Sequence, residues 1–211
     1  MALKEGDFVE IEYIGKIQGS DVIFDTTSLE KDKKGTIIVC LGHKSILKSL
    51  EDKLVGKEVG KDYKIDLNYD EAFGKKDPSL IKIIPTKVFI EKKVNPMPGL
   101  QVNIDGTIAT IRSVSGGRCV VDFNHPLAGR NLTYDVKIIK YINDLKEKVS
   151  GIIKLDFPFI GDFKLENDNL TLYSEMLDNK IKDIVKERIL ELLPEIKNIS
   201  FEELKKEDKI Q

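Results

Sequence analysis

Residues 121–134 have the sequence Val121-Asp122-Phe123-Asn124-His125-Pro126-Leu127-Ala128-Gly129-Arg130-Asn131-Leu132-Thr133-Tyr134. Apolar side chains alternate with polar or exposed positions on both sides of its centre, at Cys119, Val121 and Phe123 and again at Leu132, Tyr134 and Val136. A period of two is typical of a strand buried on one face. The centre breaks this pattern, because proline has no N–H for a ladder and glycine relaxes the backbone. The stretch therefore predicts a strand, a tight turn and a second strand.

Upstream of this stretch, the same alternation predicts an antiparallel sheet. Its strands are expected at residues 9–13, 22–25, 36–41 and 63–69, and the strand that starts at residue 132 continues to residue 141. Leu50 and Leu54 share one face of a short helix that Gly56 ends. The first domain is therefore expected to be a sheet with a single short helix packed on it.

Two further modules follow from changes of pattern. The breaker cluster at residues 95–99 precedes strands expected at 102–105, 107–114 and 118–123, with hairpin turns between them. After residue 143, a hairpin is expected at 163–173, a helix at 177–193 and a last strand at 196–201. We predict an α+β fold with three domains: residues 1–84 plus 129–150, an inserted small β domain at 85–128, and a small α+β module at 151–211.

Composition excludes several classes of protein. The chain has 211 residues, of which 33% are charged and 41% hydrophobic, and its net charge is −2. There is no basic excess of the kind that binds nucleic acid. No run approaches the roughly 18 apolar residues of a membrane helix, and the first residues contain no apolar signal segment. We expect a cytoplasmic protein without a membrane or nucleic-acid partner, in which Cys40 and Cys119 are buried reduced thiols rather than a disulfide or metal pair.

Five segments carry a resemblance to a known family. They are Val9-Glu10-Ile11-Glu12-Tyr13-Ile14-Gly15, Phe24-Asp25-Thr26-Thr27, Gly42 with Ile46-Leu47-Lys48-Ser49-Leu50-Glu51, Ala72-Phe73-Gly74, and Leu132-Thr133-Tyr134-Asp135-Val136. In this order they resemble the FKBP-type peptidyl-prolyl cis/trans isomerases, specifically the SlyD-like branch and its long archaeal type. Residues 85–128 resemble the insert-in-flap chaperone domain of that branch, and residues 121–134 resemble the junction at which the chain returns to the catalytic domain.

The resemblance implies a pocket that encloses the proline ring of a substrate. Its catalytic residues would be Tyr13, Phe24, Asp25, Ile46, Leu47, Phe73 and Tyr134, and Ile37 and Leu50 would contact the substrate. The backbone N–H near Leu47 would bind the substrate carbonyl, and Asp25 would fix the polarity of the rim. No metal or cofactor is implied, and His43 and His125 are too far apart in sequence to indicate a metal site. Phe73 stands where the family usually has tyrosine.

The insert is expected to recruit unfolded chains through apolar side chains, namely Val88, Phe89, Ile90, Met97, Leu100 and Leu127. Alternatively, Phe89, Ile90 and Leu100 form the insert's own core, just as Tyr13, Ile37 and Tyr134 could be ordinary core residues. We therefore expect a prolyl isomerase and folding chaperone that acts on unfolded polypeptides. A non-catalytic holdase on the same scaffold, or a structural subunit of a larger complex, is the alternative.

The module at 151–211 is expected to form a homodimer. Its helix carries an apolar stripe that looks broader than one small sheet can cover. The stripe comprises Met176, Leu177, Ile181, Ile184, Val185, Ile189, Leu190, Leu192 and Leu193. Docking of the extra face onto the first domain of the same chain is the alternative.

Overall fold

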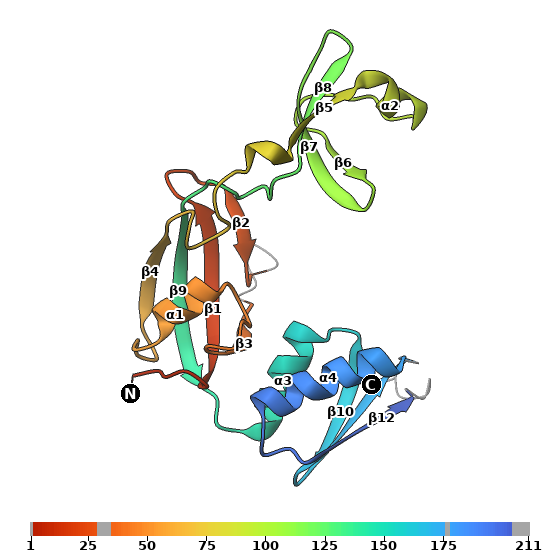
Figure 1. The fold of residues 1–211 in the computed structure, drawn as a ribbon. Coiled ribbons are helices and arrows are strands. Elements are labelled where there is room, and N and C mark those ends of the chain that lie inside the picture. Colours follow the sequence, from red (N-terminus) through yellow and green to blue (C-terminus); the bar gives the residue numbers. More distant parts are fainter. Residues whose placement is uncertain (1, 29–34, 176–177, 204–211) are drawn as a thin grey trace. The chain divides into compact units, whose positions relative to one another are not determined.

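The structure is a computed structural model that describes residues 2–28, 35–175 and 178–203. It divides into two units, residues 1–66 with 133–211, and residues 67–132. The predicted α+β class is confirmed, because antiparallel sheets are combined with a few helices (Figure 1).

The first unit contains the predicted main sheet. Its strands are β1 (Phe8–Ile17), β2 (Ile23–Thr26), β3 (Ile37–Cys40), β4 (Asp62–Leu67) and β9 (Leu132–Tyr141). They are ordered β2-β1-β9-β4, and β3 also pairs with β1. β1 pairs antiparallel with β3 through its first half and with β2 through its second half. β1 therefore connects β2 and β3 within the sheet.

Alternation explains why these strands form. In β1, Val9, Ile11 and Tyr13 are buried, whereas Glu10 and Glu12 are only partly covered. Helix α1 (Lys48–Leu54) lies in front of the sheet in Figure 1 and buries Leu50 and Leu54. Burial of one apolar face against one helix is what holds a half-exposed antiparallel sheet together.

The second unit holds the insert. Its sheet is ordered β5-β8-β7-β6, from β5 (Ile81–Pro85), β6 (Gln101–Ile104), β7 (Thr107–Ser115) and β8 (Arg118–Asp122), with every pair antiparallel. A 3-10 turn at Pro78–Leu80 precedes β5. The sheet thus starts before the boundary expected at residue 85.

Helix α2 (Thr86–Glu91) is an addition that the pattern of the insert does not predict. It carries Val88, Phe89 and Ile90 and begins directly after Pro85. A helix of six residues is too short for a period of 3.6 to be visible in the sequence. The insert core comprises Phe89, Ala109, Ile111, Cys119 and Val121.

Residues 145–203 form the C-terminal module. It contains α3 (Leu145–Asp156), β10 (Ile160–Glu166), β11 (Asn169–Ser174), α4 (Asn179–Leu192) and β12 (Asn198–Glu203). β10 and β11 form the predicted hairpin, and β12 pairs parallel to β11 after the crossover through α4. The expected helix and last strand are confirmed with slightly shifted ends, whereas α3 is not predicted and contains the boundary expected at residue 150. Met176 and Leu177 lie outside the described residues.

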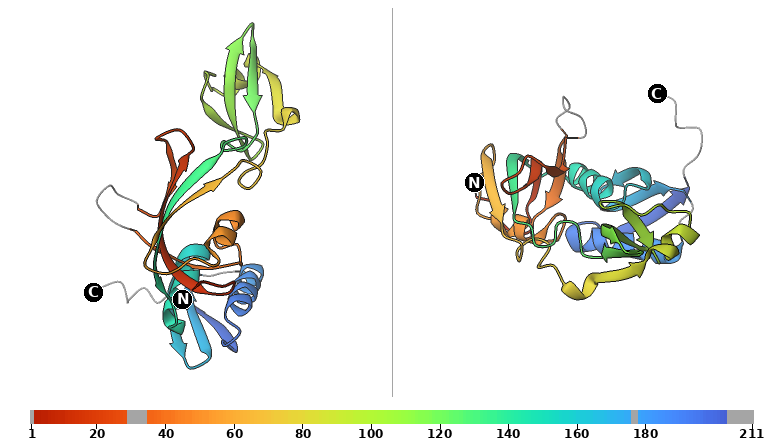
Figure 2. Two further views of the ribbon diagram at one scale, coloured as in Figure 1. Left: turned by 90° about the vertical axis from the view of Figure 1, so that its left-hand side faces the viewer. Right: turned by 90° about the horizontal axis from the view of Figure 1, so that it is seen from above.

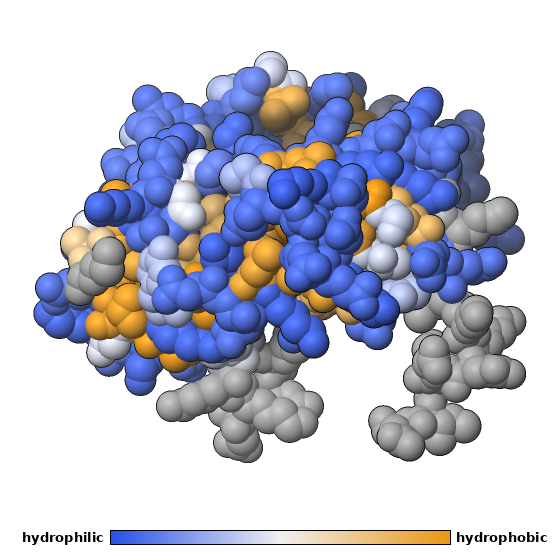
Figure 3. All heavy atoms as spheres, turned by 90° about the horizontal axis from the view of Figure 1, so that it is seen from below, coloured by the Kyte–Doolittle hydropathy of each residue, from blue (hydrophilic) through white to orange (hydrophobic). Residues whose placement is uncertain are grey.

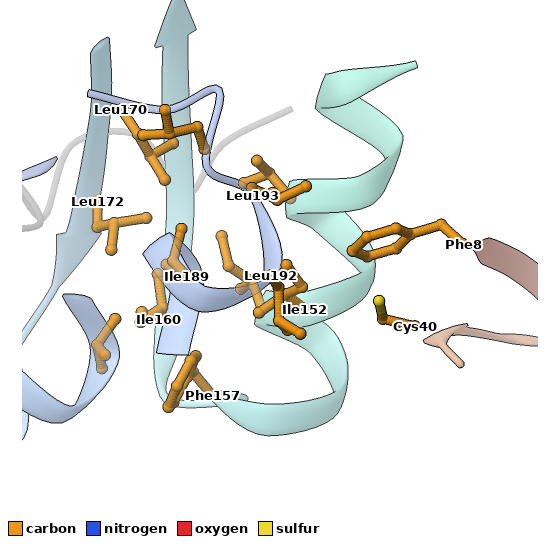
Figure 4. Close-up of a cluster of buried hydrophobic side chains, with 14 of the residues drawn as sticks. Phe8, Cys40, Ile152, Phe157, Ile160, Leu170, Leu172, Ile189, Leu192 and Leu193 are labelled. Atoms are coloured by element: carbon orange, nitrogen blue, oxygen red, sulfur yellow. The ribbon is translucent and has the colours of Figure 1, made fainter. Parts of the chain in front are cut away.

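The core of this module extends into the main domain. Val149, Ile152 and Ile153 of α3 and Val185, Ile189 and Leu192 of α4 pack on Leu170 and Leu172 of β11. Phe8 of β1 and Cys40 of β3 belong to the same buried cluster, and Figure 4 shows both side chains directed toward α3. The module and the main domain are therefore joined by one apolar core. Cys40 and Cys119 are both buried free thiols, as expected.

Polar side chains predominate on the face seen from below (Figure 3). Figure 3 shows hydrophilic residues over most of the visible face, with hydrophobic residues in small patches between them. Among the described residues, no helix combines the length and apolar character needed to cross a membrane.

Candidate active site

Three aromatic rings meet on the main sheet. Tyr13 of β1 and Tyr134 of β9 lie edge to face with ring centroids 5.7 Å apart. Phe24 of β2 meets Tyr134 at 5.6 Å and an interplanar angle of 89°. Edge-to-face pairs at these distances are favourable beyond the area that they bury. Three of the expected pocket residues, from three strands, therefore form one aromatic cluster.

Gly15 allows this cluster to form. A Cβ atom at Gly15 would lie 2.8 Å from Cζ of Phe24 and 3.0 Å from Cε1 of Tyr134. Both distances are shorter than an ordinary carbon contact, so any larger residue would push the rings away from β1. Gly15 lies in one of the motifs that resemble the family, but no role is expected for it from the sequence. A glycine inside a strand pattern is itself a signal for close approach.

Asp25 is tied to the cluster by a hydrogen bond. The hydroxyl of Tyr13 donates to Oδ2 of Asp25 at 2.8 Å, although the Asp25 side chain itself is exposed at the rim. The next residues secure this position, because Thr27 Oγ1 accepts the N–H of Tyr13 at 3.0 Å and the N–H of Thr27 donates to the carbonyl of Tyr13 at 3.1 Å. The end of β2 is thus fixed against β1.

Both tyrosines stay protonated at neutral pH. Burial raises the pKa of Tyr13 above its ordinary value, and the hydrogen bond and the charge of Asp25 raise it further. Burial, and then the charge of Asp25, raises the pKa of Tyr134 to about 12. The cluster therefore offers neutral aromatic surface with a carboxylate at its edge, rather than a base or a nucleophile.

The loop between β3 and α1 carries two more expected pocket residues, Ile46 and Leu47. Glu51 of α1 is fully buried and receives three backbone N–H groups of this loop. Its Oε2 accepts from Gly42 at 3.1 Å and from Lys44 at 3.0 Å, and its Oε1 accepts from Ile46 at 2.9 Å. Three charge-assisted hydrogen bonds to one carboxylate fix the backbone of the loop. Glu51 also lies in a motif that resembles the family, but no role is expected for it from the sequence.

The other residues expected in the pocket differ in their exposure to solvent. Leu50 of α1 is buried, whereas Ile37, Ile46 and Leu47 are half-buried. The described residues provide no hydrogen-bond partner for the N–H of Leu47. The family resemblance implies that this N–H binds the substrate carbonyl, and that role stays a prediction.

Phe73 belongs to the other unit, where it stacks on a residue that the sequence analysis did not select. The rings of Phe73 and His125 lie 4.1 Å apart and 7° from parallel. The N–H of Leu127 donates to Nδ1 of His125 at 3.2 Å, so the neutral ring carries its proton on Nε2. No sequence signal links residues 73 and 125, because they are distant along the chain.

The insert residues expected to bind substrate fall into two groups. Val88, Phe89 and Leu100 line an apolar cavity of about 370 Å³ that also contacts Ile84, Val94 and Val102. Phe89 also belongs to the insert core, and Leu100 packs against that core. Ile90 and Met97 are exposed, at 61% and 52%, and Leu127 is half-buried elsewhere in the unit.

Comparison with known proteins identifies the family. The family model "FKBP-type peptidyl-prolyl cis-trans isomerase" matches residues 1–91, and the model "FKBP26, IF domain" matches residues 82–127. The short-type peptidyl-prolyl cis-trans isomerase of Methanocaldococcus jannaschii is 27% identical over 146 residues, which cover 64% of this chain and 92% of that relative. The FKBP-type 16 kDa isomerase of Escherichia coli is 32% identical over 104 residues, which cover 47% of this chain and 70% of that relative. SlyD of Escherichia coli is 30% identical over 112 residues, which cover 52% of this chain and 57% of that relative. With this aromatic cluster and these similarities, the chain belongs to the FKBP-type peptidyl-prolyl cis-trans isomerases.

Proposed function

We propose that this isomerase acts on X–Pro bonds of unfolded polypeptides and retains those chains through its insert. Rotation about an X–Pro bond faces a barrier of about 18–20 kcal/mol that arises from amide resonance. The planar amide is more polar than the twisted transition state, so an apolar surface favours twisting. The cluster of Tyr13, Phe24 and Tyr134 supports this mechanism, because it is aromatic and uncharged and because Tyr13 and Tyr134 are buried while Phe24 is half-buried.

Two polar groups would orient the substrate on this surface. The N–H of Leu47 is proposed to donate to the carbonyl of a substrate residue, since the described residues leave that donor open. Asp25 is proposed to set the electrostatic field at the rim of the pocket, where the hydroxyl of Tyr13 donates a hydrogen bond to its carboxylate. Ile37, Ile46 and Leu50 would complete the apolar lining.

The insert is proposed to recruit unfolded chains through its apolar cavity. Unfolded polypeptides expose apolar side chains, and a cavity with an exposed rim can bury them in many arrangements. Val88 lines the cavity and is 40% exposed. Ile90 and Met97 do not line it, but they are exposed apolar side chains that are proposed to add to the binding surface. Leu127 is proposed to extend this surface.

A pair of matched variants tests the recruiting role. Val88→Asp places a charge in the cavity, whereas Ile108→Asp places the same charge on β7 at a side chain that is 64% exposed and outside the cavity lining. Val88→Asp should slow proline-limited refolding of a protein substrate several-fold and leave isomerisation of a short peptide unchanged. Ile108→Asp should change neither rate. Equal losses on both substrates, or equal effects of the two variants, would refute recruitment through this cavity.

A non-catalytic holdase is the second candidate, and Phe73 is the observation that favours it. Phe73 lacks the hydroxyl that tyrosine would offer to substrate, and its ring is stacked on His125. A protease-coupled assay of a short X–Pro peptide decides between the candidates. Acceleration above the spontaneous rate supports the isomerase, whereas an unchanged rate together with suppressed aggregation of an unfolded protein supports the holdase.

We also propose that the C-terminal module associates with a second copy of the chain. Val185, Ile189 and Leu192 fill the module's own core, but Ile181 and Ile184 remain 37% and 59% exposed on another face of α4. A symmetric pair of such faces is the usual arrangement in a homodimer. Two isomerase pockets would then act on one client at a raised effective concentration.

A further inference from the structure

Strand β3 separates two environments. Because side chains alternate along a strand, Ile37 and Val39 face one side of β3, and Ile38 and Cys40 face the other. Val39 is buried in the main domain, whereas Cys40 is part of the core of the C-terminal module and Ile38 packs against that core. The strand that carries Ile37 toward the proposed pocket is therefore covered on its opposite face by the C-terminal module.

Helix α3 approaches this face more closely than a side chain would permit. A Cβ atom at Gly151 would lie 2.6 Å from Cβ and 2.7 Å from Cγ2 of Ile38. Both atoms lie near the backbone of β3, so they cannot turn away as the end of a flexible side chain could. Figures 1 and 2 both show α3 beside β3. The position of β3 is thus set by the backbone of α3.

The loop that follows β3 is also contacted by the module. Nδ1 of His43 lies 3.3 Å from Oε1 of Glu191 on α4. Arg188 orients this carboxylate through Nη1 at 3.3 Å from Oε2, and Arg188 is itself held by Asp156 of α3 at 2.9 Å. The contact with His43, assisted by Arg188, lowers the pKa of Glu191, so its carboxylate is charged at neutral pH.

We propose that the C-terminal module positions the isomerase pocket, with Gly151 and Glu191 as positioning residues. α3 fixes the position of β3 by packing on the face that carries Ile38 and Cys40. Glu191 holds His43 in the loop that leads to Ile46 and Leu47. The inference rests on the pocket assigned above. A displacement of the Leu47 N–H by a fraction of an ångström would misalign the donor with the substrate carbonyl, and such small misplacements lower rates strongly.

A partly exposed polar contact such as that between His43 and Glu191 contributes little to stability, which makes it a suitable probe. The experiment is a double-mutant cycle of His43→Ala and Glu191→Ala in the full chain, read as kcat/KM for a short X–Pro peptide. Each single variant should lower kcat/KM about two- to fivefold with little change in the unfolding temperature, and the double variant should be no slower than either single. His43→Lys should keep the wild-type rate, because its ammonium can also reach Glu191. Glu187→Ala, an exposed position on the same helix, serves as the matched control and should have no effect.

Gly151→Ala tests the contact with β3 independently. Alanine normally stabilises a helix relative to glycine, so an ordinary surface position would gain stability without loss of activity. Here we expect kcat/KM to fall several-fold because α3 or β3 must move. The proposal is overturned if His43→Ala and Glu191→Ala leave kcat/KM unchanged, or if the loss of kcat/KM in the double variant equals the product of the two single losses. It is also overturned if Gly151→Ala stabilises the protein and leaves kcat/KM unchanged. A wild-type chain without isomerase activity would refute the proposed function instead.

Discussion

At the scale of single residues, the hydrogen bond between Tyr13 and Asp25 distinguishes the proposed pocket from an ordinary aromatic core. Core packing needs the rings of Tyr13, Phe24 and Tyr134, but it does not need a carboxylate held at their edge. The hydroxyl of Tyr13 is what connects the two parts.

Tyr13→Phe should therefore lower activity more than stability. The variant keeps the ring and removes the donor to Asp25, so we expect kcat/KM for a short peptide to fall about threefold to tenfold. The free energy of unfolding should fall by about 1 kcal/mol, the usual net value of one hydrogen bond. Tyr141→Phe is the matched control, because the Tyr141 hydroxyl also donates to an aspartate, Asp7 at 3.1 Å, away from the cluster. If both variants lose the same activity, the Tyr13–Asp25 pair has no specific role.

Glu51 is the second residue on which the pocket depends. Replacement by glutamine puts an amide nitrogen where a carboxylate oxygen now accepts backbone N–H groups, so at least one donor of the loop loses its acceptor. Glu51→Gln should cost about 1–3 kcal/mol of unfolding free energy and should also lower kcat/KM.

Asp52→Asn provides the comparison for that variant. Asp52 lies on the same helix but is exposed and paired with Lys48. Urea unfolding and the peptide assay on both variants check the prediction, and a Glu51→Gln protein as stable and active as Asp52→Asn would contradict it.

At the scale of elements, the insert sheet is tied together by one buried carboxylate. Asp122 ends β8 and pairs with Lys76 at 3.0 Å and with Nε of Arg112 at 2.9 Å. Burial acts to raise the pKa of Asp122, but hydrogen bonds from Asn124 and the contact with Lys76 outweigh it and lower the pKa to about 2. A group with a lowered pKa stabilises the fold above the pKa of the unfolded chain, about 4, and loses that effect as the pH falls toward 2.

Comparison of Asp122→Asn with the wild type should accordingly show that Asp122 contributes about 2 kcal/mol to the free energy of unfolding of the insert, and that acid removes this contribution. The difference in insert stability between the wild type and the variant should be largest at pH 6 and should shrink as the pH falls from about 4 to 2. Hydrogen exchange of the insert amides measures it. Asp105→Asn, in the turn between β6 and β7, is the control. A difference that does not change with pH would rule out this role of Asp122.

At the scale of the whole molecule, the C-terminal module combines two kinds of surface. One face shares a core with Phe8 and Cys40, which agrees with the alternative of docking on the first domain of the same chain. Ile181 and Ile184 lie on an exposed face of α4 that is separate from this shared core. Docking within the chain and the proposed dimer are therefore compatible.

Ile184→Asp should convert a dimer into a monomer, because it places a charge on the most exposed apolar side chain of α4. Light scattering on the full chain measures the mass directly. Val22→Asp is the control, since Val22 is comparably exposed, at 55%, in the β1–β2 connection. A monomeric wild type, or a dimer that survives Ile184→Asp, would exclude association through this face.

Strand and hairpin positions follow from local pattern. Val9, Ile11 and Tyr13 alternate with glutamates, and the turn at Asp105–Gly106 separates two alternating runs, so each segment carries its own signal. The local pattern of α3 is also present, since Leu145, Val149, Ile152 and Ile153 fall on one helical face. Gly151 lies within this pattern and weakens the helix signal, because glycine lowers helix propensity. The motifs that resemble the family also predict, from the sequence alone, that Tyr13, Phe24 and Tyr134 are pocket residues.

Other features depend on contacts between residues that are distant along the chain. Gly151 is a poor helix residue until Ile38 is placed against it, and Cys40 fits either of two cores until α3 covers its face of β3. Glu51 looks like an ordinary helical glutamate until the preceding loop folds its N–H groups onto the carboxylate. Periodicity reports which side of an element is buried. It does not report what lies on that side, because the partner is selected by packing and hydrogen bonding across the whole fold.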